Sequence, residues 1–230
     1  MKSVMKLLAP AGLALAAVAT TVPATAQVQG NIATANVARA ILGTTALQTA
    51  YQQVNTTYAA QLETRRTKQQ ELSTLLQPFD TNGSGQIEDS EMRAVQNAPN
   101  VAQITTLESE IAAINQQVNN ARIFAVEQIL RQYPVALQEI STAQQIVVVF
   151  EPEAIQFAGE GLDITPLIVT NLNTKVPTVG IVPPADYRPS RQGATIFQEI
   201  QQTLLTAQLI QQQQAAQQQQ QGNTQAPEGR

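Results

Sequence analysis

Residues 101–130 read VAQITTLESEIAAINQQVNNARIFAVEQIL, and this stretch decides the fold. Its apolar residues recur three and four positions apart, the spacing of one face of an α-helix. We expect a helix capped by Asn100, with Gln103 in the reciprocal capping position, that runs to about residue 142 and is kinked by Pro134. Its length would be roughly 64 Å. The stripe consists of Ile104, Leu107, Ile111, Ile114, Val118, Ala121, Ala125 and Ile129.

A similar stripe precedes this one and predicts a helix over about 44–77, roughly 50 Å long. Pro78 should distort or end its last turn. Two long stripes of similar length predict an antiparallel helical hairpin, an arm that spans 46–142. The first stripe consists of Leu47, Tyr51, Val54, Tyr58, Leu62, Arg65, Leu72, Leu75 and Leu76.

One helical hairpin buries too little surface to offset the cost of ordering its residues, so the arm needs a base. Strand-like runs at 31–37, 146–150 and 154–159 flank it. Asp163 or Thr165 could cap a following helix that has Pro166 in its first turn. The sequence therefore predicts an α+β fold in which 27–45 and 143–180 form a small β-rich body.

Residues 80–91, DTNGSGQIEDSE, match the loop of an EF-hand calcium site, and the flanking helices extend the motif to 76–98. Ca²⁺ prefers hard oxygen ligands, and a glycine at position 6 permits the sharp turn. Gly85 occupies that position. The predicted ligands are the side chains of Asp80, Asn82, Ser84, Glu88 and Glu91, and the backbone carbonyl of Gln86.

A simple Asx and glycine turn would use some of the same residues, so a chance match stays open. Three carboxylates and no second loop predict a calcium affinity near the roughly 10⁻⁴ to 10⁻³ M class. We expect the ion chiefly to fix the geometry of the arm tip, with switching as the secondary role.

The N-terminus has the pattern of a signal peptide: a basic start with Lys2 and Lys6, an apolar stretch, and the cleavage motif Ala24-Thr25-Ala26. Cleavage after Ala26 predicts an exported protein, although a retained membrane helix is a weaker alternative. Removing 1–26 takes the formal charge from −4 to −6, which argues against nucleic acid as a partner. The sequence contains neither His nor Cys, and the remaining polar residues lack the spacing of a catalytic site. We therefore expect no enzymatic activity.

The C-terminal segment 181–230 begins in a proline-rich linker, which we place over 177–192. Ile196, Ile200, Leu204 and Ala207 then predict an amphipathic helix, followed by a glutamine-rich tail. The helical stripe would pack on the body or pair with neighbouring molecules.

The order of strand, long hairpin, strands and helix resembles the Skp/OmpH family of periplasmic chaperones. The resemblance covers about 30–180 and rests on IATANV at 32–37, IVVVF at 146–150 and DITPLI at 163–168. It implies a periplasmic homotrimer whose three arms enclose an unfolded outer-membrane protein, and it leaves a peripheral membrane contact open. The family has a simple hairpin turn where this chain has the calcium-type loop, and its well-known members are basic.

Two classes of function follow. The first is a holdase chaperone with Ca²⁺ at the arm tip. The second is a calcium-dependent envelope adaptor that uses the loop to bind a partner. In a chaperone, client contacts would come from side chains on the arm, unless these belong only to the seam or to the solvated face. The candidates are Tyr51, Tyr58, Arg65, Arg66, Lys68, Arg122, Phe124 and Arg131.

Overall fold

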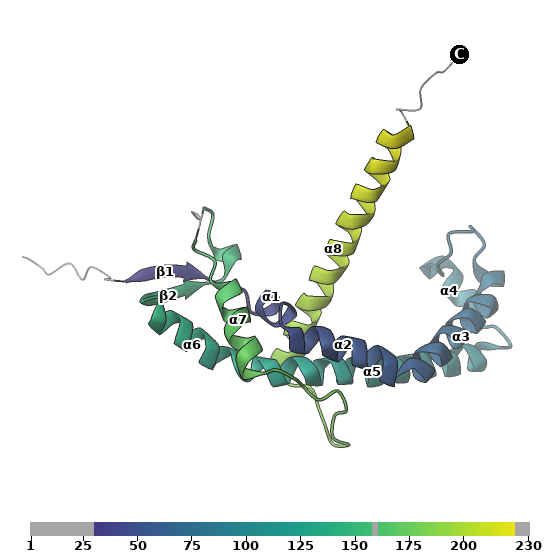
Figure 1. Cartoon of the computed structure of the whole chain (residues 1–230). Coiled ribbons are helices and arrows are strands. Elements are labelled where there is room, and N and C mark those ends of the chain that lie inside the picture. The colour runs from purple at the N-terminus through teal and green to yellow at the C-terminus, as the bar shows by residue number, and fades with distance from the viewer. Residues whose placement is uncertain (1–29, 158–160, 224–230) are drawn as a thin grey trace, which may run out of the picture.

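A computed structural model describes residues 30–157 and 161–223. A long helical arm extends from one side of a small body, and a second long helix, α8, projects from the body in another direction (Figure 1). The predicted signal peptide and the chain end at 224–230 lie outside the described residues.

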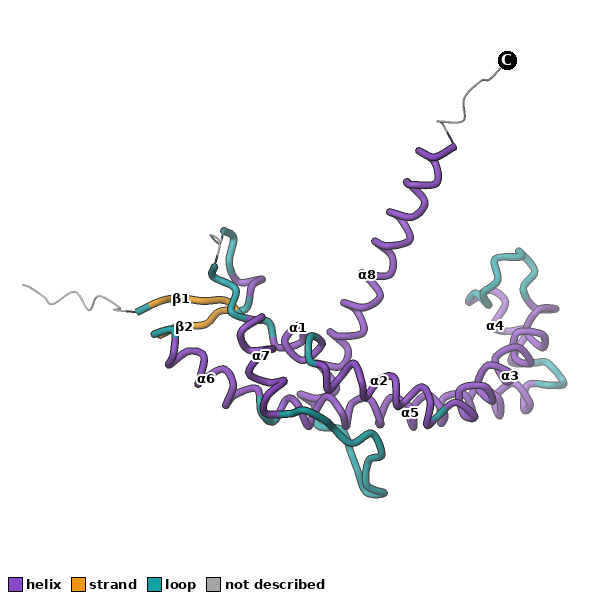
Figure 2. Tube along the Cα trace, viewed as in Figure 1, coloured by secondary structure: helices purple, strands orange, loops and turns teal. Residues whose placement is uncertain are grey.

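The only sheet among the described residues has two parallel strands, β1 (Asn31–Thr34) and β2 (Ile146–Phe150), which Figure 2 shows in orange. The strand predicted over 31–37 is therefore too long. Asn36 accepts a hydrogen bond from the Arg39 amide at 2.8 Å and so caps helix α1 (Val37–Leu42). This capping preference outweighs the alternating pattern.

The strand predicted over 154–159 is wrong within the described residues. A short 3₁₀ helix, η2 (Pro152–Ala154), occupies the start of this segment because Pro152 fits the first turn of a helix. Residues 155–157 form no strand, and 158–160 lie outside the described residues. Thr34 instead forms an isolated bridge with Asp163. The body is accordingly richer in helix than predicted.

The body core is built mainly by helices, namely α1, α6 (Tyr133–Ala143), α7 (Thr165–Lys175), the start of α8 (Arg191–Asn223) and the ends of the two long arm helices that adjoin the body. Thr44 is fully buried and caps the first arm helix, while Asn173 accepts a hydrogen bond from the Thr45 amide at 2.9 Å. The Asn173 contact joins the arm to α7. The fully buried large side chains of this core are Ile41, Leu47, Val126, Ile129, Ile168, Leu172 and Ile200.

The arm pairs α2 (Thr45–Thr57) and α3 (Ala59–Leu76) with α5 (Val101–Leu130). The first arm helix breaks at Tyr58, after two β-branched threonines that disfavour helix. The second arm helix ends at Leu130, and the chain resumes as α6. Pro134 cannot continue one helix, because it has no backbone N–H and its ring would clash with the carbonyl four residues earlier. The seam at mid-arm contains Val54, Tyr58, Val118 and Ala121.

At the far end of the arm, the 3₁₀ turn η1 (Gln77–Phe79) ends the outgoing helix at Pro78, as predicted. Residues 80–88, the tip loop, lead into α4 (Asp89–Gln96), and a short turn then starts α5 (Figure 1). The predicted capping box at the start of α5 is absent. The Asn100 side chain makes no capping bond, and Gln103 donates to Glu71 across the arm at 2.9 Å.

Candidate functional sites along the arm

The arm residues considered for client binding occupy very different surroundings. Tyr58 is 7% exposed and belongs to the seam, so it is not available on the surface. Lys68 is paired with Glu110 at 2.6 Å, while Arg66 and Arg131 are exposed. The structure therefore leaves Arg66 and Arg131 as the freely accessible members of the set.

Tyr51 and Arg122 pack against each other beside the seam. Arg122 lies over the ring of Tyr51, with 5.8 Å between the guanidinium carbon and the ring centroid. Burial raises the pKa of Tyr51 to about 12, against the opposing effect of the Arg122 charge. Burial also lowers the pKa of Arg122, and the charge of Arg65 lowers it further.

Phe124 is covered by the segment 177–190, here called the linker. Its ring meets that of Tyr187 edge to face, with centroids 5.2 Å apart. The Glu127 carboxylate accepts hydrogen bonds from the Tyr187 hydroxyl at 2.9 Å and from the Ser190 amide at 2.7 Å. Burial, followed by the bond to Glu127 and its charge, raises the pKa of Tyr187. No local pattern in the sequence predicts this contact, because its partners are 60 positions apart.

The tip loop adopts the backbone that its glycines predict. Gly83 and Gly85 have φ of 69° and 79°, in the left-handed region that favours glycine. The carboxylate of Asp80 accepts hydrogen bonds from the amides of Ser84 at 3.0 Å and Gly85 at 2.7 Å. The predicted turn at Gly85 is therefore confirmed, and it curls the loop around Asp80.

Glu91 closes the loop from the first turn of α4. One of its carboxylate oxygens accepts from the amide and hydroxyl of Thr81 at 2.6 and 2.7 Å, and the other accepts from the Glu88 amide at 3.2 Å. The Thr81 hydroxyl is the largest cause of a lowered pKa at Glu91, so this group is an anion at neutral pH.

The loop gathers carboxylate, amide, hydroxyl and carbonyl oxygens, which are the types of ligand that a hard cation prefers. Within the described chain, however, no three acidic side chains converge closely enough to hold a metal ion. Ser84 donates to the Gln86 carbonyl at 3.0 Å, so two of the predicted ligands bond to each other. The loop thus orders Asp80 and Glu91 at its two ends through separate sets of hydrogen bonds.

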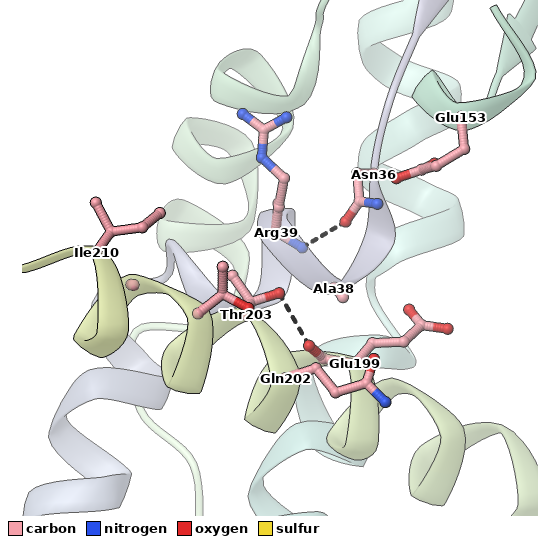
Figure 3. A pocket seen from close by; sticks show the side chains of 10 residues that line it. Asn36, Ala38, Arg39, Glu153, Glu199, Gln202, Thr203 and Ile210 are labelled. Atoms are coloured by element: carbon pink, nitrogen blue, oxygen red, sulfur yellow. Dashed lines mark hydrogen bonds between the residues drawn. The ribbon is translucent and has the colours of Figure 1, made fainter. Parts of the chain in front are cut away.

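A pocket at the base of the arm lies between α1 and α8 (Figure 3). Asn36 and Thr203 use their side chains for hydrogen bonds within their own helices. Arg39 pairs with Asp163 at 3.4 Å, and Glu153 and Glu199 supply negative charge. Burial, followed by the charges of Glu153 and Glu199, raises the pKa of nearby Glu151. The pocket is an acidic surface rather than a catalytic arrangement.

Helices of the described chain are all too short or too polar to cross a membrane. No curated protein matches the sequence. Among solved structures, the chain is similar to a candidate OmpH-like outer membrane chaperone from Caulobacter crescentus CB15. The two share 17% identity with a TM-score of 0.41 over 77% of this chain and 96% of the other.

The family model for OmpH-like outer membrane proteins matches residues 31–172, which include the sheet, the whole arm and most of α7. The linker and α8 lie beyond the match. Since more than half of the chain fits this model, the protein belongs to the OmpH-like family.

Proposed function

We propose that this protein is a periplasmic holdase chaperone that binds unfolded outer-membrane proteins in a cage of three arms. Membership of the OmpH-like family supports a chaperone role. The observation that carries the proposal is the arm, because α3 has no buried residue and so offers most of its surface to another molecule.

The exposed sheet supports assembly into a trimer. Parallel sheets are normally covered on both faces, and a sheet of two strands is marginal by itself. In the single chain, Ile32 and Val147 are each 50% exposed, and Phe150 is 42% exposed. Contact with further copies would bury these apolar side chains and complete the base on which each arm stands.

The chaperone activity is tested by diluting an unfolded outer-membrane barrel protein from denaturant and following its aggregation by light scattering. The purified chain should suppress the scattering at a ratio near one trimer per client. Absence of suppression would refute the holdase and leave the adaptor function.

The assembly is tested separately by measuring the mass of the protein in solution. The native protein should have three times the mass of one chain, and Val147→Asp should lower this mass by placing a charge in the apolar contact. Val182→Asp is the matched control, since Val182 is 66% exposed in the linker. A native monomer would contradict the cage.

Calcium binding at the tip loop is the second part of the proposal. Asp80, Asn82, Ser84, Glu88 and Glu91 would hold the ion with the carbonyl of Gln86, and the ion would supply charge neutralisation for the loop. The anionic Glu91 and the left-handed Gly85 support this assignment. The bound ion would fix the direction in which α4 leaves the loop.

An ion that binds only the folded state must stabilise it. With a dissociation constant of 0.1–1 mM, about 10 mM Ca²⁺ should add about 1.4–2.7 kcal/mol to the free energy of unfolding. Glu91→Gln should remove this gain, whereas Glu108→Gln, an equal charge change at an exposed site on α5, should retain it. Identical melts in calcium and chelator would refute the site. Suppression of aggregation measured in the same two buffers decides whether the ion regulates the chaperone.

A further inference from the structure

Residues 182–189, here called the outer linker, are fastened to the arm mainly through Tyr187. The structure describes all of these residues, and none of them is buried. The part of the linker before them is held differently, because Val179 and Ile181 pack on the apolar core of the body. In the outer linker, the Tyr187 ring meets Phe124, and the Tyr187 hydroxyl donates to Glu127 at 2.9 Å. Loss of this one side-chain contact would therefore free the outer linker.

Both ends of the outer linker have anchors of their own. Before it, the Gln128 side-chain amide exchanges two hydrogen bonds with the backbone of Gly180, at 2.8 and 2.9 Å. After it, the Ser190 hydroxyl accepts from the Gly193 amide at 3.0 Å, so Ser190 caps the start of α8. Release of 182–189 would therefore break no helix and would leave α8 in place.

The Glu127 carboxylate gains a free acceptor when Tyr187 leaves. Its Oε2 atom accepts from the Tyr187 hydroxyl, while its Oε1 atom accepts from the Ser190 amide at 2.7 Å. Since Ser190 stays with α8, its amide would keep the carboxylate oriented. Phe124 and Glu127 line the same pocket, which lies between the arm and the outer linker. The arm thus offers an aromatic ring and one directed acceptor at one place.

A tyrosine from another polypeptide matches this site. Tyr187 reaches Phe124 with its ring and Glu127 with its hydroxyl at the same time, so the spacing of the two groups fits that side chain. Phenylalanine would keep only the ring contact, and serine only the hydroxyl. A hydrogen bond to a carboxylate is stronger than one between neutral groups, which favours tyrosine over phenylalanine. We propose that Phe124 and Glu127 bind a tyrosine side chain of an unfolded client, and that Tyr187 occupies this site until a client displaces it.

This proposal rests on the proposed chaperone function and adds a preference and a regulating contact to it. Because the outer linker is tethered next to the site, a client needs a tyrosine in an extended segment to compete with it. The apparent affinity for such a client is reduced in proportion to the fraction of molecules whose site is open. Loosening the Tyr187 contact should therefore tighten client binding. A linker that only supports the fold predicts otherwise, since its loss would weaken client binding or leave it unchanged.

The site itself is tested with a synthetic peptide of residues 182–189 as the probe, on the full exported chain carrying Tyr187→Ala. Saturation-transfer NMR should show contact between the tyrosine ring of the peptide and the protein. The affinity should be about tenfold higher than that of the native chain, whose site is occupied. Arg188→Ala is the matched control, because Arg188 is the exposed neighbour of Tyr187, and this variant should bind the peptide as the native chain does. Equal binding by the two variants, or binding that survives the addition of Phe124→Ala, would overturn the site.

The source of the tyrosine is tested with two unfolded peptides that differ only by Tyr or Ser at one position. Tyr187→Ala should tighten binding of the Tyr peptide about tenfold and leave the Ser peptide unchanged, while Arg188→Ala should affect neither. Equal affinity of the Tyr187→Ala chain for both peptides, or weaker binding of the Tyr peptide than by the native chain, would overturn the assignment to a client. Failure of both chains to bind either peptide would instead refute the chaperone function, while the peptide of 182–189 still decides the site.

Discussion

Gly193→Ala should destabilise the contact between the linker and the arm, although alanine is the better helix former. Gly193 lies in the first turn of α8, where an added Cβ would come within 3.0 Å of Cγ, Cδ and Oε1 of Glu127. Because Cγ is among these atoms, the whole Glu127 side chain must move. That movement breaks its hydrogen bonds to the Tyr187 hydroxyl and the Ser190 amide.

The magnitude follows from two opposing effects. A hydrogen bond to a charged group contributes about 1.5 kcal/mol at the lower end of its range, so loss of both costs about 3 kcal/mol. Replacing glycine by alanine in a helix returns about 1 kcal/mol. The expected net loss is about 2 kcal/mol in the free energy of unfolding.

Denaturant unfolding followed by circular dichroism, at one fixed protein concentration, measures this change. The decisive control is Gly193→Ala in a Glu127→Ala background, where the clashing side chain and both bonds are already absent. There the same substitution should stabilise the protein by about 1 kcal/mol. If Gly193→Ala has the same sign in both backgrounds, the reasoning from the Glu127 contact is wrong.

Three further predictions concern the seam, the tyrosines and the tail. Val118→Ala should lower the free energy of unfolding in denaturant by about 2 kcal/mol, because Val118 is 2% exposed. Val135→Ala, at a side chain that is 43% exposed, should lower it by less than about 0.5 kcal/mol. Equal losses would contradict the assigned seam. Burial raises the pKa of Tyr51 and Tyr133 to about 12, so the folded protein favours the neutral form of both side chains. The free energy of unfolding should therefore be unchanged below pH ~10 and fall as the pH rises towards 12. Tyr51→Phe should remove one late step from the ultraviolet titration of tyrosinate, and an unchanged curve would contradict its burial. Ending the chain after Ala207 should change the melting temperature by no more than about 2 °C. The reason is that no described side chain of α8 beyond Ile200 is buried. A larger decrease would show that the distal part of α8 packs on the protein.

The sequence predicted the arm well because its stripes are long and periodic. Pro78 and Gly85 act through local backbone rules, so their effects could also be predicted without tertiary information. The strands were harder to predict from the sequence. A short alternating run such as 31–37 fits either one strand or a shorter strand followed by a capped helix, and the hydrogen bond to the Asn36 side chain selects the second.

The candidate site was only partly predictable, for a physical reason. Helical spacing indicates that Tyr58 and Arg65 lie near the seam, but it cannot show that Tyr58 is buried while Arg65 donates a hydrogen bond to Asn115 of α5. That distinction depends on contacts between α3 and α5. The docking of the linker through Glu127 has the same origin, because no local pattern connects Tyr187 to α5.

The pairing of β1 with β2 also sets an order of folding. The strands are neighbours in space, yet Asn31 bonds to Gln144 across a separation of 113 residues. Closing a loop of this length as a free chain is entropically costly, whereas helices and their hairpin form from contacts that grow outward from the turn. We therefore expect the arm to form from the loop at 80–88 towards Thr45 before the two strands meet. If its seam is the nucleus on which the body closes, weakening Val118 should slow folding as well as lower stability.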